Sequence, residues 1–161
     1  MLEHEHEAAE ALFHETVEMD LAGVSPWGPW GLALAHLNLA MVAWFLHRPD
    51  DAFAHAGEGV ARMRRLGDPI GLASSLFIAA AVAAARADAH RAGVLLGVVD
   101  RAFAEAGERH EPTSLMLREA IFERASPEER KLLVEGMRAE PAPTLEQAVA
   151  ETFPELDPPT P

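Results

Sequence analysis

The chain has 161 residues, a formal net charge of -13 at pH 7 and no cysteine, with 49% hydrophobic and 24% charged residues. This length and composition predict one globular domain. The negative charge argues against direct nucleic-acid binding, because affinity for phosphates comes largely from Lys and Arg. The absence of cysteine excludes disulfides and thiolate zinc sites. The first residues are acidic and polar, unlike a signal peptide, so we expect a cytoplasmic protein without membrane contact.

Apolar periodicity and capping signals predict an all-α protein. Two stretches read as capping boxes with a Ser or Thr at the N-cap, namely Ser126 to Glu129 and Thr144 to Gln147. The segment Gly23 to Pro29 is rich in Gly and Pro and predicts a loop. Residues 154–161 contain four prolines and predict a disordered tail. The helices are expected at about 3–21, 30–47, 50–66, 70–87, 89–106, 112–125, 127–138 and 145–153.

Two helices between Gly71 and Ala106 organise the chain. The first, over Leu72 to Ala85, is apolar on nearly every face and must be covered on several sides. It is shorter than the roughly 20 residues that span a bilayer, which favours a central helix of a soluble stack. Asp88 is expected to cap the helix that follows.

The helix pairs repeat at a spacing of about 40 residues. Small side chains at equivalent positions allow helices to approach closely, so we expect stacked hairpins with Ala92 in a tight crossing. The equivalent sets are Ala9/Phe13/Thr16, Ala52/Ala56/Gly59 and Ala92/Leu96/Val99.

The segment from His36 to Ala52 resembles a tetratricopeptide repeat, with Leu39 and Ala40 in its first helix and Ala52 at the small position of its second. The resemblance implies tetratricopeptide-like antiparallel helical hairpins stacked in a right-handed superhelix. We expect a C-terminal helical cap to close this stack, within a single domain over residues 1–153.

A second resemblance rests on Leu66 to Ala73 (LGDPIGLA) and Arg91 to Gly97 (RAGVLLG). Repeats with these motifs are similar to the C-terminal helical-repeat region of large bacterial ATP-dependent transcriptional regulators, the LuxR-type and related families. The likeness covers roughly residues 8–150. Such regulators also carry a nucleotide-binding domain and a DNA-reading helix-turn-helix, and neither motif occurs in this sequence. The resemblance implies a regulatory fragment or a stand-alone relative.

Catalytic and metal-binding motifs are weak. The densest group of candidate metal ligands is His4, Glu5, His6 and Glu7 with His14, but the spacing is poor for one helix face and no HExxH pair exists. Ser74 lies in a predicted helix without a nucleophile elbow. We therefore expect no catalytic residue, cofactor or metal. The alternative is a small enzyme or metal-binding protein with an unrecognised His/Glu site.

The concave face of a helical stack is the better candidate for function, because first helices of each pair line it and offer aromatic, Met, amide and hydroxyl groups. We expect it to bind a protein or peptide, or a small effector. The alternative is that the C-terminal helices pack across this face and fill it. The candidate groove residues are His36, Asn38, Met41, Trp44, Phe45 and Ser75.

A second candidate surface lies at the N-terminal edge. The aromatic residues Trp44, Phe45, Phe53 and Phe77 exceed what two neighbouring helices can cover, and the chain starts with the second helix of a pair. We expect a homodimer, or a contact with a preceding domain. Trp27 and Trp30 also read as apolar lids over a helix end, in preference to a ligand platform. The candidate interface residues are Leu12, Phe13, Trp27 and Trp30.

Overall fold

The computed structural model describes residues 2–23 and 27–156, and in these ranges it contains helices and no strand. The all-α class is therefore confirmed, and the helix boundaries lie within about two residues of the predicted ones for most elements. The helices are α1 (Leu2–Leu21), α2 (Gly28–Phe45), α3 (Pro49–Leu66), α4 (Pro69–Ala85), α5 (Ala89–Ala106), α6 (Pro112–Arg124), α7 (Pro127–Met137) and α8 (Leu145–Thr152).

Two predicted irregular segments differ from the structure. The expected loop over residues 23–29 ends earlier, because Gly28 and Pro29 already belong to the first turn of α2. The expected disordered tail is wrong at its start, since Pro154–Leu156 form a 3-10 helix. Residues 24–26 and 157–161, which complete these two predictions, lie outside the described residues.

Local capping sets the helix ends as the sequence predicted. Asp68 accepts hydrogen bonds from the backbone N–H groups of Ile70 and Gly71, and Asp88 accepts one from Arg91. Both capping boxes form, with Ser126 and Thr144 as the N-cap residues. Each such cap stabilises its helix by about 1 kcal/mol.

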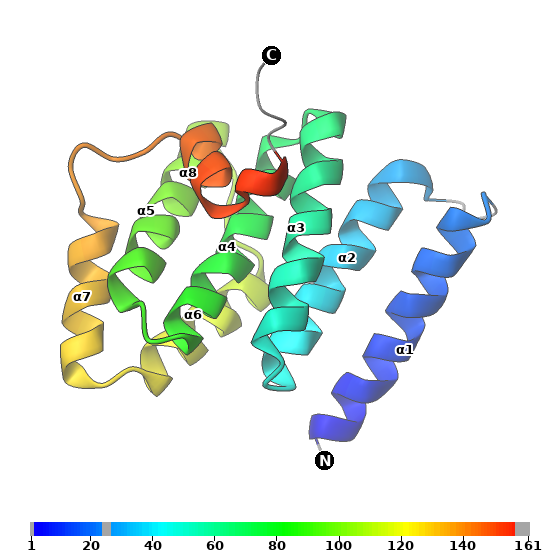
Figure 1. The fold of residues 1–161 in the computed structure, drawn as a ribbon, viewed down its shortest axis with the longest axis horizontal. Coiled ribbons are helices and arrows are strands. Elements are labelled where there is room, and N and C mark those ends of the chain that lie inside the picture. Colours follow the sequence, from blue (N-terminus) through cyan, green and yellow to red (C-terminus); the bar gives the residue numbers. More distant parts are fainter. Residues whose placement is uncertain (1, 24–26, 157–161) are drawn as a thin grey trace.

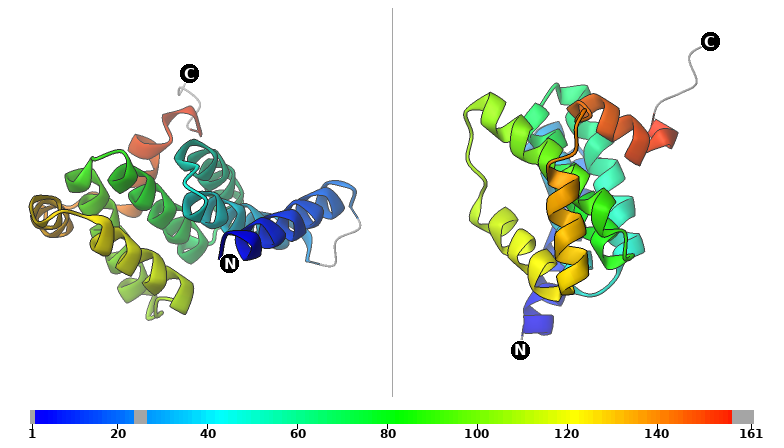
Figure 2. Two further views of the ribbon diagram at one scale, coloured as in Figure 1. Left: turned by 90° about the horizontal axis from the view of Figure 1, so that it is seen from below. Right: turned by 90° about the vertical axis from the view of Figure 1, so that its left-hand side faces the viewer.

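The helices α1 to α5 stand side by side in a row, each packed against the next one (Figure 1). The remaining helices flank the C-terminal half of this row. Helix α7 packs on α5, while α6 packs on α4 from one side of the row and α8 contacts α4 and α5 from the opposite side (Figure 2). Helix α1 forms one end of the row and packs mainly on α2.

Helix α4 is the centre of the fold. It contacts α2, α3, α5, α6 and α8, which confirms that its almost uniformly apolar sequence is covered on several sides. Alanines such as Ala80 and Ala81 are fully buried in it and keep the neighbouring helices close. Ala92 of α5 is also fully buried, as its place in the repeat predicted.

The crossing of α5 and α7 is closer than any side chain would permit. A Cβ atom on Gly93 would lie 2.1 Å from the carbonyl oxygen of Leu133, and one on Gly136 would lie 2.3 Å from the carbonyl oxygen of His90. Real Cβ contacts are not this short, so the backbones of the two helices touch through glycine.

The large aromatic side chains of the middle helices pack within the chain, against more helices than the two neighbours counted from the sequence. The Trp44 indole N–H donates to the carbonyl of Ala81, and the Arg124 guanidinium lies 4.4 Å from the centroid of the Trp44 ring. Phe45 stacks on His6 of α1. Two further aromatics are covered in the same way: Phe53 stacks on Phe153, and Phe77 is buried.

Candidate functional site

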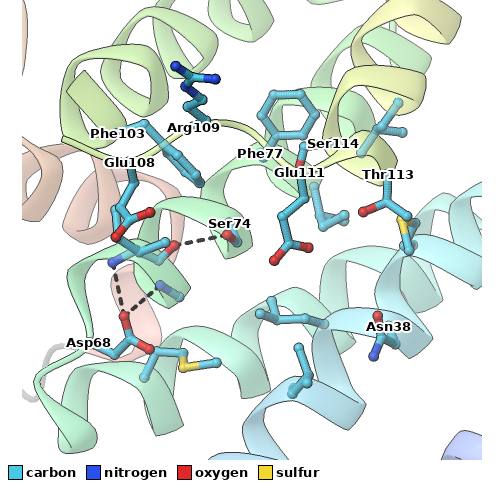
Figure 3. A pocket seen from close by; sticks show the side chains of 18 of the residues that line it. Asn38, Asp68, Ser74, Phe77, Phe103, Glu108, Arg109, Glu111, Thr113 and Ser114 are labelled. Carbon is cyan, nitrogen blue, oxygen red and sulfur yellow. Dashed lines mark hydrogen bonds between the residues drawn. The ribbon is translucent and has the colours of Figure 1, made fainter. Parts of the chain in front are cut away.

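A hollow of about 420 Å³ opens between α2, α4 and α6 (Figure 3). Residues of α6 line this hollow and no residue of α8 does, and α8 lies on the opposite side of the row from α6 (Figure 2). Its floor is apolar because α2 and α4 are apolar on several faces. The apolar lining residues are Trp30, Leu34, Leu37, Met41, Met63, Ile70, Phe77, Ile78, Phe103 and Leu117.

Polar side chains surround this floor, mostly from the segment that joins α5 to α6. Glu108, Arg109 and Glu111 come from this connection, and Asp68 comes from the start of α4. The Asp68 carboxylate also accepts a hydrogen bond from the Trp30 indole N–H at 3.3 Å, which ties α2 to the start of α4. Neutral polar groups complete the lining: Asn38, Ser74, Thr113 and Ser114.

The connection between α5 and α6 is fastened to the body of the protein by His110. The His110 ring stacks on Phe103 with a centroid separation of 4.4 Å, and its Nε2 atom lies 2.9 Å from a carboxylate oxygen of Asp100. The same Asp100 oxygen accepts a hydrogen bond from Arg118 of α6. These contacts join α5, the connection and α6, and thereby fix one wall of the hollow.

A second hollow of about 210 Å³ lies between α1 and α2. Trp30, Leu34 and Asn38 line both hollows, and their spacing of four residues places them along one ridge of α2. The lining of the second hollow also includes Phe13, Thr16, Trp27 and Ala35. The two hollows therefore form neighbouring depressions on either side of an α2 ridge.

The structure places the candidate groove residues in two different environments. Asn38 and Met41 line the larger hollow. Ser75 is fully buried and its hydroxyl donates to the carbonyl of Gly71, while the adjacent Ser74 faces the hollow instead. The other three, His36, Trp44 and Phe45, pack against α1, α3, α4 or α6 and do not line it.

The candidate interface residues gather around the second hollow. Phe13, Trp27 and Trp30 line it, and Leu12 lies nearby on the exposed face of α1. The exposed fractions of Leu12, Trp27 and Trp30 are 63%, 69% and 48%. Apolar side chains this exposed are available for contact with another molecule.

A cluster of three histidines sits where α1, α2 and α3 meet, and sequence reasoning missed it. His36 and His55 approach with their Nδ1 atoms 3.2 Å apart, and the His14 ring lies 6.0 Å from that of His55. Burial, followed by the nearby Arg62 and His55, lowers the pKa of His36 from 6.5 to about 4. Burial also lowers the pKa of His55, with His14 as the next cause. Both rings are therefore neutral at pH 7.

The side chains weighed for an enzyme or a metal site have the following surroundings. Among residues 2–23 and 27–156, no group of three or more His, Cys, Asp or Glu side chains is arranged to hold a metal ion. In the histidine-rich start of α1, the His4 Nδ1 atom lies 3.2 Å from a carboxylate oxygen of Glu7, and the His6 ring stacks on Phe45. The Ser74 hydroxyl donates to the carbonyl of Ile70, within its own helix.

Sequence reasoning also missed the charged connection that forms the rim of the larger hollow. Its signal was the run from Glu108 to Glu111, placed between Gly107, which ends α5 in a left-handed conformation, and Pro112, which starts α6. A short charged segment between two helix-boundary residues marks an exposed turn. Which side of the protein the turn faces depends on how α6 packs.

No protein-family model matches the chain, and no curated protein or solved structure matches it either. Within the described part of the chain, no helix has both the length and the apolar character needed to cross a membrane.

Proposed function

We propose that the protein is a non-catalytic helical-repeat module that binds a segment of another protein in the hollow between α2, α4 and α6. The observation that carries this proposal is the open apolar floor on a side of the row that α8 leaves uncovered. A concave apolar surface with a few polar groups is the usual form of a binding site. The hydroxyl groups of Ser74 and Ser75 bond within their own helix, which disfavours a nucleophile.

The packing of the small residues supports a tetratricopeptide-like arrangement of the hairpins. Ala52 of α3 and Ala92 of α5 occupy equivalent positions in the repeat, and both are fully buried. In this reading, α2 with α3 and α4 with α5 are successive hairpins, whereas α6 packs on α4 and α7 packs on α5. Stacked repeats of this kind present their first helices to a ligand, and here α2, α4 and α6 line the hollow.

A role within or beside a bacterial transcriptional regulator fits this module. Its net charge of -13 disfavours contact with DNA, so its partner would be a protein. The exposed Leu12, Trp27 and Trp30 offer a second contact surface for a homodimer or for a preceding domain. A stable contact there would bury at least about 1,000 Å².

Selection from a random peptide library tests the proposed function. Binding of the selected peptides is measured by fluorescence anisotropy against the parent protein and Asn38→Trp, whose indole would occupy the hollow. Ala104→Trp is the control, because Ala104 is exposed on α5 and does not line the hollow. We expect Asn38→Trp to abolish binding and Ala104→Trp to retain it. Equal binding by both variants would place the site elsewhere and reject the proposal.

A further inference from the structure

We infer that the hollow between α2, α4 and α6 selects a basic peptide segment, in which a Lys or Arg side chain stands beside bulky apolar residues. This inference rests on the proposed function, because it names the kind of segment that the hollow takes. It depends on four features: the charge of the rim, the freedom of the rim carboxylates, the fixed position of the rim, and the shape of the apolar floor.

The rim of the hollow carries an excess of negative charge. Three carboxylates line it, those of Asp68, Glu108 and Glu111, against the single cation Arg109. Figure 3 shows the Glu111 carboxylate directed over the floor of the hollow, whereas the Arg109 guanidinium points away from its centre. The potential over the apolar floor is therefore negative and attracts a cation.

The two glutamates of the rim are free to receive a ligand. Among the described residues, neither the Glu108 carboxylate nor the Glu111 carboxylate takes part in a hydrogen bond or an ion pair, and Arg109 does not neutralise either of them. Glu111 is the N-cap residue of α6, yet its carboxylate makes no capping hydrogen bond. By contrast, Asp68 is occupied by its cap and by Trp30, so it contributes charge but not a free acceptor pair.

The rim is held in place before any ligand binds. His110 lies between the two glutamates in the sequence, and its ring is fixed by Phe103 on one face and by Asp100 at Nε2. Arg118 joins the same Asp100 and lies over the Phe77 ring at 5.7 Å. A segment already ordered in this way loses little conformational entropy on binding, which favours affinity.

The floor suits the apolar part of a basic side chain and its neighbours. The aliphatic stems of Lys and Arg pack on apolar surfaces while their charged ends stay near water and carboxylates. Trp30 and Phe103 add aromatic surface at the edge of the floor. The second hollow, across the ridge of Trp30, Leu34 and Asn38, extends the apolar surface beyond the reach of a small amine. An extended peptide can occupy both depressions.

Three short synthetic peptides test the inference. They share the same apolar residues and carry Lys, Gln or Glu at every polar position. We expect the Lys peptide to bind most tightly and the Glu peptide least tightly, with a difference that shrinks at high salt. The double variant Glu108→Gln with Glu111→Gln should bind the Lys peptide roughly three- to tenfold more weakly than the parent does. Its affinity for the Gln peptide should not change.

The matched control is Glu119→Gln with Glu123→Gln. It removes the same charge from exposed positions of α6 that do not line the hollow, and should leave the Lys peptide affinity unchanged. If both double variants lost the same affinity for the Lys peptide, the net charge of the protein would explain the binding and the rim of the hollow would not. That result would overturn the inference.

The remaining outcomes separate this inference from the function on which it rests. The parent protein could bind the Lys and Gln peptides with equal affinity, and Asn38→Trp could bind neither. That result would support the peptide site and reject its selectivity for a basic segment. Failure of every peptide to bind would reject the proposed function itself. Binding of hexylammonium as tight as that of the Lys peptide would show that a small amine suffices, and would overturn the choice of a peptide.

Discussion

The imidazole rings of His36 and His55 meet across the contact between α2 and α3, with their Nδ1 atoms 3.2 Å apart. At this distance the Nδ1–H group of one ring donates a hydrogen bond to the Nδ1 atom of the other, so two neutral rings here are in different tautomers. The surrounding charges come from Glu10 and His14 of α1 and from Asp51, Glu58 and Arg62 of α3. Protonation of both rings would place two cations in contact.

The free energy of unfolding should therefore fall in acid. Because the pKa of His36 is about 4 in the folded protein and 6.5 in the unfolded chain, the unfolded chain binds the proton first as the pH falls. The stabilisation is complete above pH 6.5 and is lost progressively toward pH 4. Over this range the free energy of unfolding should fall by about 2 kcal/mol. Urea denaturation across this range measures it.

The variant His36→Gln should flatten this pH dependence, since it removes the buried titrating ring. His90→Gln is the control, because His90 is exposed on α5. A parent-like slope in His36→Gln would show that the acid sensitivity arises from other groups.

The variant Gly93→Ala should destabilise the protein by about 2 kcal/mol or more, because its Cβ atom would overlap the backbone of α7. Gly57→Ala is a matched control in the middle of α3, where a Cβ atom would meet Phe153 at 3.5 Å. There alanine should stabilise the helix by about 0.5–1 kcal/mol. Thermal denaturation compares the two. A stable Gly93→Ala variant would contradict the close crossing of α5 and α7.

The variant Phe153→Ala should cost about 3 kcal/mol, because the ring is buried and stacks on Phe53 of α3. Leu132→Ala, at an exposed position of α7, should change the free energy of unfolding by less than about 0.5 kcal/mol. Chemical denaturation of both variants measures these effects. Similar stabilities for the two would mean that the stacking of Phe153 on Phe53 does not hold the end of α8 against α3.

The variant Asp100→Asn should loosen the rim of the larger hollow. Without the carboxylate, Arg118 and His110 lose the group that joins them, at a cost of about 1 kcal/mol. Amide hydrogen exchange of residues 108–111 should become faster. Asp50→Asn is the control, because it removes the carboxylate from the more exposed ion pair between Asp50 and Arg86. It should leave the stability of the protein and the amide exchange of residues 108–111 unchanged. Unchanged exchange in Asp100→Asn would show that the connection is fixed by other contacts.

Association through the N-terminal edge can be measured by sedimentation at micromolar concentration. If the exposed apolar residues there form a homodimer, the parent protein should sediment as a dimer and Leu12→Lys as a monomer. Leu115→Lys, at an exposed position of α6, should remain dimeric. A monomeric parent protein would exclude the homodimer.

The sequence by itself determined the helices, because their signals are local. Each of these signals acts within a few residues of the helix end that it sets. They are proline in the first turn, the capping boxes of Ser126 and Thr144, and the glycine that follows α3 and α5. The central place of α4 also followed from the sequence, since a helix that is apolar on every face has to be buried.

Only the tertiary structure decided which side chains share a site. Ser74 and Ser75 are neighbours with the same hydroxyl, yet one faces the hollow and the other is buried, because successive residues of a helix point about 100° apart. His14, His36 and His55 meet although they are far apart in the sequence, because α1 and α3 both pack against α2. Contacts of this kind depend on how helices cross. The periodicity of a helix determines which of its faces is buried, but it does not determine which residues of other helices that face contacts.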